Sequence, residues 1–153
     1  MGTRGKEVSI SGLLWRPIAH RGLHGNGTGI PENSVAAFRR AVAWNYPVEM
    51  DVQLLKDGHL AVFHDDTLLR MAGCEERIRN YDAAHVRQLT LAGTKEHVPL
   101  LSEVLECIGG KVPVFIELKT VERFGGRLEK GLIQALEGYH GPCAIGAVKT
   151  MSL

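Results

Sequence analysis

The sequence predicts an α/β fold in which parallel strands form a sheet and helices pack outside it. The chain has 153 residues, which is enough for one domain with its own core. Short apolar runs alternate with stretches of helical spacing, as in strand–helix–strand units. Charged residues lie within or directly after these runs, which matches the rule that barrel active sites lie at the carboxyl ends of strands.

Composition narrows the classes of protein that fit. Hydrophobic residues make up 44% of the chain and charged residues 23%, as in ordinary globular proteins. The net charge of +1 gives no general attraction to nucleic acid. No run approaches the ~18 apolar residues of a membrane span and no secretory signal is visible, so we expect a cytoplasmic protein. Three scattered cysteines, with no CxxC pair, disfavour a disulfide framework or a zinc site.

Each expected element follows from local pattern. Apolar runs predict five strands, over residues 16–20, 48–55, 60–64, 112–118 and 143–148. Helical spacing predicts helices after Asn33 or Ser34, over residues 82–89, from Pro99 to Ile108 and over residues 128–136. Pro47 is the expected stop of the first helix, and residues 65–80 have the composition of a polar loop.

The connection between the second and third strands is too short to hold a helix. Asp57 and Gly58 mark a turn inside it. A hairpin at this turn would place Asp51 and His64 roughly opposite each other, and a parallel strand reached by a looping return would also bring them near. The sequence leaves both arrangements open, and both make Asp51 and His64 neighbours.

Three carboxylates lie on the expected strands. Glu49 and Asp51 are two residues apart, so they share a face, and Glu117 lies on a later strand with Lys119. Carboxylates this close raise one another's pKa unless a cation lies between them. An all-oxygen set suits Mg²⁺ or Ca²⁺ better than zinc. The alternative is that they form salt bridges at the rim of the sheet.

Two histidines and two cations complete the candidate site. His20 and His64 each end an apolar run, and imidazole suits proton transfer near neutral pH. Arg21 and Lys119 could bind phosphate oxygens, or pair with neighbouring carboxylates instead. The remaining histidines lie in polar or turn context and are expected to be structural: His24, His59, His85, His97 and His140.

Six short motifs, taken together and in order, resemble the glycerophosphodiester phosphodiesterase family. They are His20-Arg21-Gly22, Pro31-Glu32-Asn33-Ser34, Glu49-x-Asp51, Asp57-Gly58, His64-Asp65 and Glu117-Leu118-Lys119. The segment that starts at Pro99 is also similar to a helix start of the family. Each motif alone is weak, but six in order make a specific signal, and the resemblance covers roughly residues 16–139.

The resemblance implies a TIM-type (β/α)8 barrel and a hydrolase of lipid metabolism. Such an enzyme splits small glycerophosphodiesters into glycerol 3-phosphate and an alcohol. The residues at His20 and His64 would be the acid–base pair, and those at Arg21 and Lys119 would contact the phosphate. A divalent cation, Mg²⁺ or Ca²⁺, would be held by the three carboxylates: Glu49, Asp51 and Glu117.

The chain departs from the family after the fifth expected strand. A full barrel runs to roughly 250 residues, so strands six to eight have no counterpart here. We therefore expect an entry segment (1–14), a partial phosphodiesterase domain (15–148) cut short at about five strands, and an aberrant tail (149–153). Free strand edges would favour self-association. The activity of a chain cut short in this way is left open.

Two other functions stay compatible with the sequence. One is a non-catalytic remnant that binds metal or a phosphate headgroup. The other is a related lyase of the sphingomyelinase D or phosphatidylinositol phospholipase type, which shares the histidines and the acidic ligands. Two segments favour the glycerol family over the lyases: Pro31-Glu32-Asn33-Ser34 and Asp57-Gly58.

Overall fold

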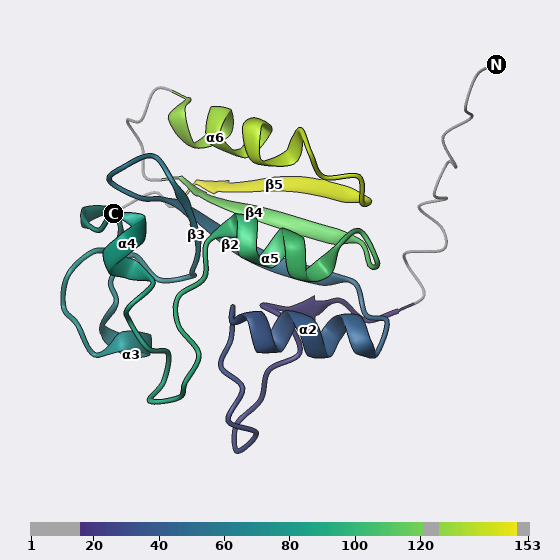
Figure 1. Ribbon diagram of the computed structural model, residues 1–153, viewed down its shortest axis with the longest axis horizontal. Helices are drawn as coiled ribbons and strands as arrows, with labels where there is room; N and C mark the ends of the chain where they lie inside the picture. Colours follow the sequence, from purple (N-terminus) through teal and green to yellow (C-terminus); the bar gives the residue numbers. More distant parts are fainter. Residues whose placement is uncertain (1–15, 121–125, 150–153) are drawn as a thin grey trace.

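The computed structural model describes residues 16–120 and 126–149, and the expected entry segment 1–14 lies outside them (Figure 1). In chain order the elements are β1 (Ala19–His20), α2 (Val35–Ala43), β2 (Val48–Leu54), β3 (Leu60–Val62), α3 (Leu69–Ala72), the 3₁₀ helix η1 (Ile78–Asn80), α4 (Ala83–Val86), α5 (Leu101–Ile108), β4 (Val114–Thr120), α6 (Arg127–Leu136) and β5 (Cys143–Lys149). Strand β5 ends at Lys149, and the other residues of the expected tail, 150–153, lie outside the described residues.

The five expected strands form one sheet, of which four run parallel. The parallel strands follow the order β1-β2-β4-β5. Strand β3 instead pairs antiparallel with β2, with Val52 opposite Val62 and Leu54 opposite Leu60. The turn before β3 is therefore a hairpin, which decides between the two arrangements that the sequence left open. Gly58 takes a φ of 90° in this turn, a conformation that favours glycine.

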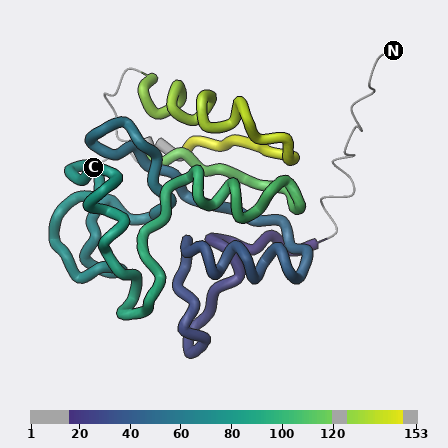
Figure 2. The backbone as a smooth tube through the Cα atoms, viewed as in Figure 1, coloured from purple at the N-terminus to yellow at the C-terminus, as the bar shows by residue number. Residues whose placement is uncertain are grey.

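The central strand separates an apolar face from a polar one. Val48, Met50 and Val52 of β2 are fully buried in a core that also contains residues of α2, α5 and α6. Figure 1 shows these three helices in succession across the sheet, and Figure 2 traces the same arrangement along the backbone. Side chains alternate along a strand, so Glu49, Asp51 and Gln53 point to the face opposite the helices.

A second, smaller core corrects the expectation of a polar loop over residues 65–80. This region contains α3 and η1, and Leu68, Met71 and Ile78 are buried there. Leu68 and Met71 have helical spacing, but Gly73 follows two residues later, so the pattern is too short to predict a helix. The three buried side chains pack with Ala61 and Phe63, so this core lies directly beside the end of β3.

Helix boundaries differ from expectation by a few residues. Ser34, and not Asn33, is the N-cap of α2, and its hydroxyl accepts a hydrogen bond from the Ala37 amide. The helix ends at Ala43, before Pro47, and Asn45 turns the chain with a φ of 57°. None of the described helices is both long enough and apolar enough to cross a membrane. Location in the cytoplasm stays a prediction.

Candidate active site

The carboxyl end of β1 brings His20 and Arg21 to Glu49. In the strand register His20 lies beside Glu49, and His20 Nε2 is 3.8 Å from Glu49 Oε2. The Arg21 amide donates a 3.1 Å hydrogen bond to the same oxygen. Arg21 and Gly22 both have positive φ, and a Cβ at Gly22 would lie 2.7 Å from the Ala37 Cβ. Only glycine therefore lets the chain turn here against α2.

The three strand carboxylates lie together, as the sequence predicts. Each of Glu49, Asp51 and Glu117 offers one oxygen, and these oxygens lie within 4.8 Å of one another. The register explains the cluster because Asp51 of β2 lies directly beside Glu117 of β4. Burial, together with the Asp51 charge, raises the pKa of Glu49 to about 7. The cluster therefore carries more negative charge than its surroundings stabilise.

The donor set of this cluster fits a divalent cation. Asp51 is fully buried, and Glu49 Oε1 is buried without a hydrogen-bond partner. Unpaired buried oxygens are costly unless a charge or a donor satisfies them. Three carboxylates with no nitrogen or sulfur ligand are typical of hard cations such as Mg²⁺ and Ca²⁺.

Both candidate phosphate-binding cations pair with carboxylates in the structure. Lys119 Nζ forms an ion pair with Asp51 Oδ1 at 3.0 Å and also contacts Glu117. Burial alone would lower the pKa of Lys119, but these two carboxylates raise it. Arg21 Nε is 3.2 Å from Asp51 Oδ2. Positive charge therefore borders the carboxylate cluster on two sides.

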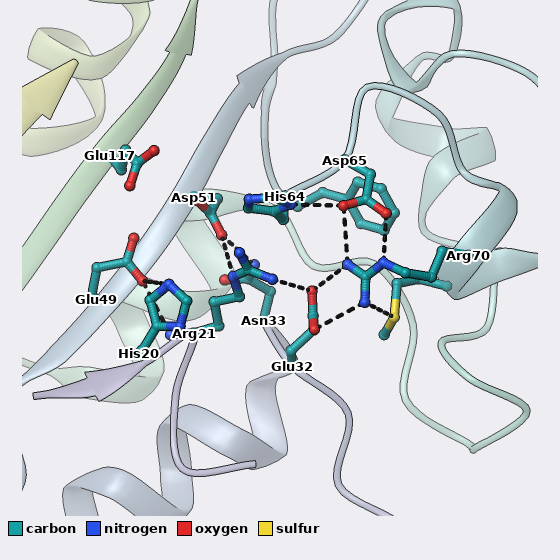
Figure 3. A network of polar contacts seen from close by, with 12 residues as sticks. His20, Arg21, Glu32, Asn33, Glu49, Asp51, His64, Asp65, Arg70 and Glu117 are labelled. Carbon is teal, nitrogen blue, oxygen red and sulfur yellow. Dashed lines mark hydrogen bonds and ion pairs between the residues drawn. The ribbon is translucent and has the colours of Figure 1, made fainter. Parts of the chain in front are cut away.

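His64 follows β3 and is held by its neighbours. Its Nδ1 is 2.7 Å from Asp65 Oδ1. The Gln53 side-chain amide donates 2.8 Å hydrogen bonds to the carbonyl oxygens of Phe63 and Asp65, which fixes the backbone on either side of His64. The His64 side chain is 32% exposed, compared with 65% for His20. Figure 3 shows the two histidines on different sides of the Arg21 guanidinium.

Four polar residues of this network escaped the sequence analysis as site residues: Glu32, Asn33, Gln53 and Arg70. Glu32 and Asn33 were interpreted as part of a helix start and of a family motif, and neither was assigned a role in the site. Asn33 donates a 2.9 Å hydrogen bond from Nδ2 to Asp51 Oδ2, and Glu32 Oε1 accepts one of 3.0 Å from Arg21 Nη1. The signal that the sequence offered for Glu32 and Asn33 was an acidic and an amide side chain directly before the N-cap of a helix. Arg70 gave no signal in the sequence.

The histidines expected to be structural behave in that way where contacts are described. His59 and His85 form surface ion pairs with Asp57 and Asp82, at 3.0 and 2.7 Å. His97 Nε2 lies 3.6 Å from Glu103, which binds the start of α5. None of these contacts involves the carboxylate cluster.

Comparison with known proteins agrees with the geometry. The model of the glycerophosphoryl diester phosphodiesterase family matches residues 20–136. A glycerophosphodiester phosphodiesterase of Caldanaerobacter subterraneus subsp. tengcongensis is 39% identical over 132 residues, which cover 80% of this chain and 53% of the relative. A glycerophosphodiester phosphodiesterase of Bacillus altitudinis is 39% identical over 126 residues, covering 74% of this chain and 49% of the relative.

A solved structure extends the likeness to the fold. An Oleispira antarctica phosphodiesterase, determined in complex with the product sn-glycerol-3-phosphate, superposes with a TM-score of 0.82 at 28% identity. The match covers 92% of this chain and 60% of that structure. The fold is thus that of a TIM-type barrel, of which the chain supplies a part, and it spans about half the length of the curated relatives it matches. The chain belongs to the glycerophosphoryl diester phosphodiesterase family.

Proposed function

We propose that this chain carries the residues of a metal-dependent phosphodiesterase that converts glycerophosphodiesters into glycerol 3-phosphate and an alcohol. The observation that carries the proposal is the carboxylate cluster, in which Glu49, Asp51 and Glu117 lie within 4.8 Å of one another beside His20. Family membership supports the same substrate class. Because the chain spans about half of its relatives, the activity of the whole protein is part of the proposal.

The metal would be Mg²⁺ or Ca²⁺, held by Glu49, Asp51 and Glu117. The buried Glu49 oxygen that has no hydrogen-bond partner, within a cluster of three carboxylates, favours this assignment. Bound there, the ion would neutralise charge on the phosphate oxygens and lower the barrier to attack. Asn33 supports the arrangement because its hydrogen bond orients the Asp51 carboxylate.

The two histidines would handle the protons. Hydrolysis requires one group to accept a proton from the attacking water and another to donate a proton to the departing alcohol oxygen. His20 and His64 lie on either side of Arg21, as these two tasks require. Arg21 and Lys119 would exchange part of their carboxylate contacts for phosphate oxygens when substrate binds.

Turnover of bis(4-nitrophenyl) phosphate and of glycerophosphocholine, with Mg²⁺, with Ca²⁺ and with a chelator, tests this function. We expect metal-dependent release of 4-nitrophenol from the first substrate, and of choline and glycerol 3-phosphate from the second, which phosphorus NMR detects. Binding of metal without turnover would instead support the non-catalytic remnant. Accumulation of a cyclic phosphate would support the related lyases. Asp51→Asn should abolish turnover, and Asp66→Asn, at an exposed ion pair with Arg77, is the matched control.

A further inference from the structure

The guanidinium of one arginine connects the part of the candidate site that contains Arg21 with the part that contains His64. Arg70 lies in α3, outside every motif that identified the family, yet it contacts both Glu32 and Asp65. We propose that Arg70 is a positioning residue that holds Arg21 and His64 in fixed relation to each other by binding Glu32 and Asp65 at the same time. Figure 3 shows Arg70 between the two carboxylates.

The geometry is that of two paired hydrogen bonds. Arg70 Nε and Nη2 donate to Asp65 Oδ2 and Oδ1 at 2.7 and 3.0 Å. Arg70 Nη1 and Nη2 donate to Glu32 Oε2 and Oε1 at 3.1 and 2.6 Å. Four of the five N–H groups of the guanidinium are therefore used on carboxylates. Lysine cannot reproduce this because its ammonium acts as a point charge.

Two of these carboxylate oxygens also contact Arg21 and His64, the residues expected to bind the phosphate and to transfer a proton. Glu32 Oε1 also accepts a 3.0 Å hydrogen bond from Arg21 Nη1. Asp65 Oδ1 also lies 2.7 Å from His64 Nδ1. A continuous chain of polar contacts thus runs from the expected phosphate-binding arginine to one expected acid–base histidine, with Arg70 at its centre.

The contact with Asp65 determines which nitrogen of His64 is available. An aspartate is already ionised near neutral pH, and Arg70 lowers the pKa of Asp65 further, to about 2, so this carboxylate has no proton to give. His64 Nδ1 must then be the donor in their hydrogen bond. The proton of the neutral ring resides on Nδ1, and Nε2 is left free to exchange a proton with substrate.

The segment that carries Arg70 is well anchored. Leu68 and Met71, on either side of it, are buried in the second core. Backbone hydrogen bonds from Leu68 to Glu76 and from Ile78 to Asp66 tie the segment to η1. Gly73 closes α3 in the left-handed conformation, with a φ of 70°. The guanidinium is therefore held by a small packed unit, as positioning requires.

Imidazole proton–nitrogen correlation spectra of the full chain test this role without any need for activity. The His64 signals are identified by their loss in His64→Asn. In the wild type we expect the proton on Nδ1, together with an Arg70 Nε–H that exchanges slowly with water. Without the two hydrogen bonds from Arg70, Asp65 should no longer be held against His64 Nδ1, so Arg70→Lys and Arg70→Gln should shift His64 to a mixture of tautomers. Arg77→Gln, at the exposed pair with Asp66, is the matched control and should leave the spectrum unchanged.

A kinetic measurement adds a second readout, and this part rests on the proposed function. With bis(4-nitrophenyl) phosphate, both Arg70 variants should lower kcat and raise KM, with a total loss in kcat/KM of about tenfold to a hundredfold. A merely structural role would lower the number of active molecules and so reduce kcat alone. If the wild type shows no turnover, the proposed function fails, and the spectra still decide on Arg70.

Three results would overturn the proposal. They are a wild-type His64 with its proton on Nε2, a rapidly exchanging Arg70 Nε–H, and an Arg70→Lys variant that keeps the wild-type tautomer. If both Arg70 variants lose their far-ultraviolet circular dichroism, the two wild-type measurements decide the question.

Discussion

The two histidines of the candidate site lie in unlike surroundings. His64 is 2.7 Å from Asp65, and Gln53 binds the backbone on either side of it. His20 ends a strand of two residues at the edge of the sheet, its side chain is 65% exposed, and its ion-pair contact with Glu49 is 3.8 Å. His64 is therefore held in place before any ligand arrives, whereas His20 is not.

The difference shows which part of the site the fold organises by itself. Fixing a side chain costs rotamer entropy, which contacts must offset. At His64 the contacts with Asp65 and Gln53 do so within the described chain. At His20 the neighbouring group is Glu49, a carboxylate with a buried oxygen that has no hydrogen-bond partner. We therefore expect the orientation of His20 to depend on what binds beside Glu49.

The largest expected effect is on turnover. His20→Ala and His64→Ala should each lower hydrolysis by about 10²–10⁴-fold, the usual contribution of a general acid or base. Initial rates on bis(4-nitrophenyl) phosphate measure this, with circular dichroism as the check on folding. Retained activity in His20→Ala would contradict this, because it would show that the exposed histidine takes no part in catalysis. His59→Ala, at a surface pair with Asp57, is the control.

Metal should reduce the contrast between the two histidines. We expect Mg²⁺ or Ca²⁺ to bind the carboxylate cluster and order its surroundings, including His20. Asp51→Asn should weaken binding by at least about tenfold to a hundredfold, because loss of a residue that only supports a ligand already has that effect. Calorimetric titration of both proteins gives the affinities, with Asp66→Asn as the control. Equal binding by wild type and Asp51→Asn would remove the metal assignment.

The pairing at His64 should appear as a stability that depends on pH. Arg70 and His64 lower the pKa of Asp65 from 3.8 to about 2, so Asp65 stabilises the fold above pH ~4, and this contribution is lost as the pH falls through about 2. The shift corresponds to about 2 kcal/mol.

Urea denaturation of wild type and Asp65→Asn at several pH values measures this contribution. We expect the difference in the free energy of unfolding to be about 2 kcal/mol at pH 6 and to approach zero near pH 2. His20→Ala should change the same free energy by less than about 0.5 kcal/mol, because its side chain is mostly exposed. A difference for Asp65→Asn that does not vary with pH would contradict the ion-pair explanation.

The alternation of apolar and charged residues in the sequence predicted well the part of the site around His20. Alternation along one strand placed Glu49 and Asp51 on the same face, and the parallel register then brought Glu117 beside Asp51. The five strands also followed from short apolar runs. What the pattern could not decide was the direction of β3, because a hairpin and a looping return use the same turn residues.

The His64 side was harder to predict because its contacts join distant parts of the chain. Arg70 and Glu32 are 38 residues apart. Nothing in the sequence around either residue indicates that α3 meets the segment before α2. Gly73 cuts short the pattern of Leu68 and Met71, and Ile78 follows three charged residues, so their burial follows from a tertiary core and not from a helical pattern. Long-range packing therefore decided both α3 and the position of Arg70.

The smallest expected effect concerns the edges of the sheet, where His20 lies. Among the described residues, β5 pairs with β4 and with no other strand, and Ile145 on it is 53% exposed. Strand β1 likewise pairs only with β2, and Ile18 before it is 46% exposed. Open edges with apolar side chains favour pairing between copies. We therefore expect the 153-residue chain, prepared on its own, to self-associate through these edges.

A charge on the edge strand should weaken this association. Ile145→Lys is expected to raise the dissociation constant by roughly fivefold, since one cross-strand contact contributes up to about 1 kcal/mol. Ile133→Lys is the matched control, because Ile133 is 61% exposed but lies on α6. Light scattering coupled to size exclusion, over a range of protein concentrations, measures both. If association covers β1, His20 should become less accessible to diethyl pyrocarbonate in the associated form while His64 changes little. A chain that stays monomeric at all concentrations, or equal effects of the two lysines, would show that the strand edges play no part.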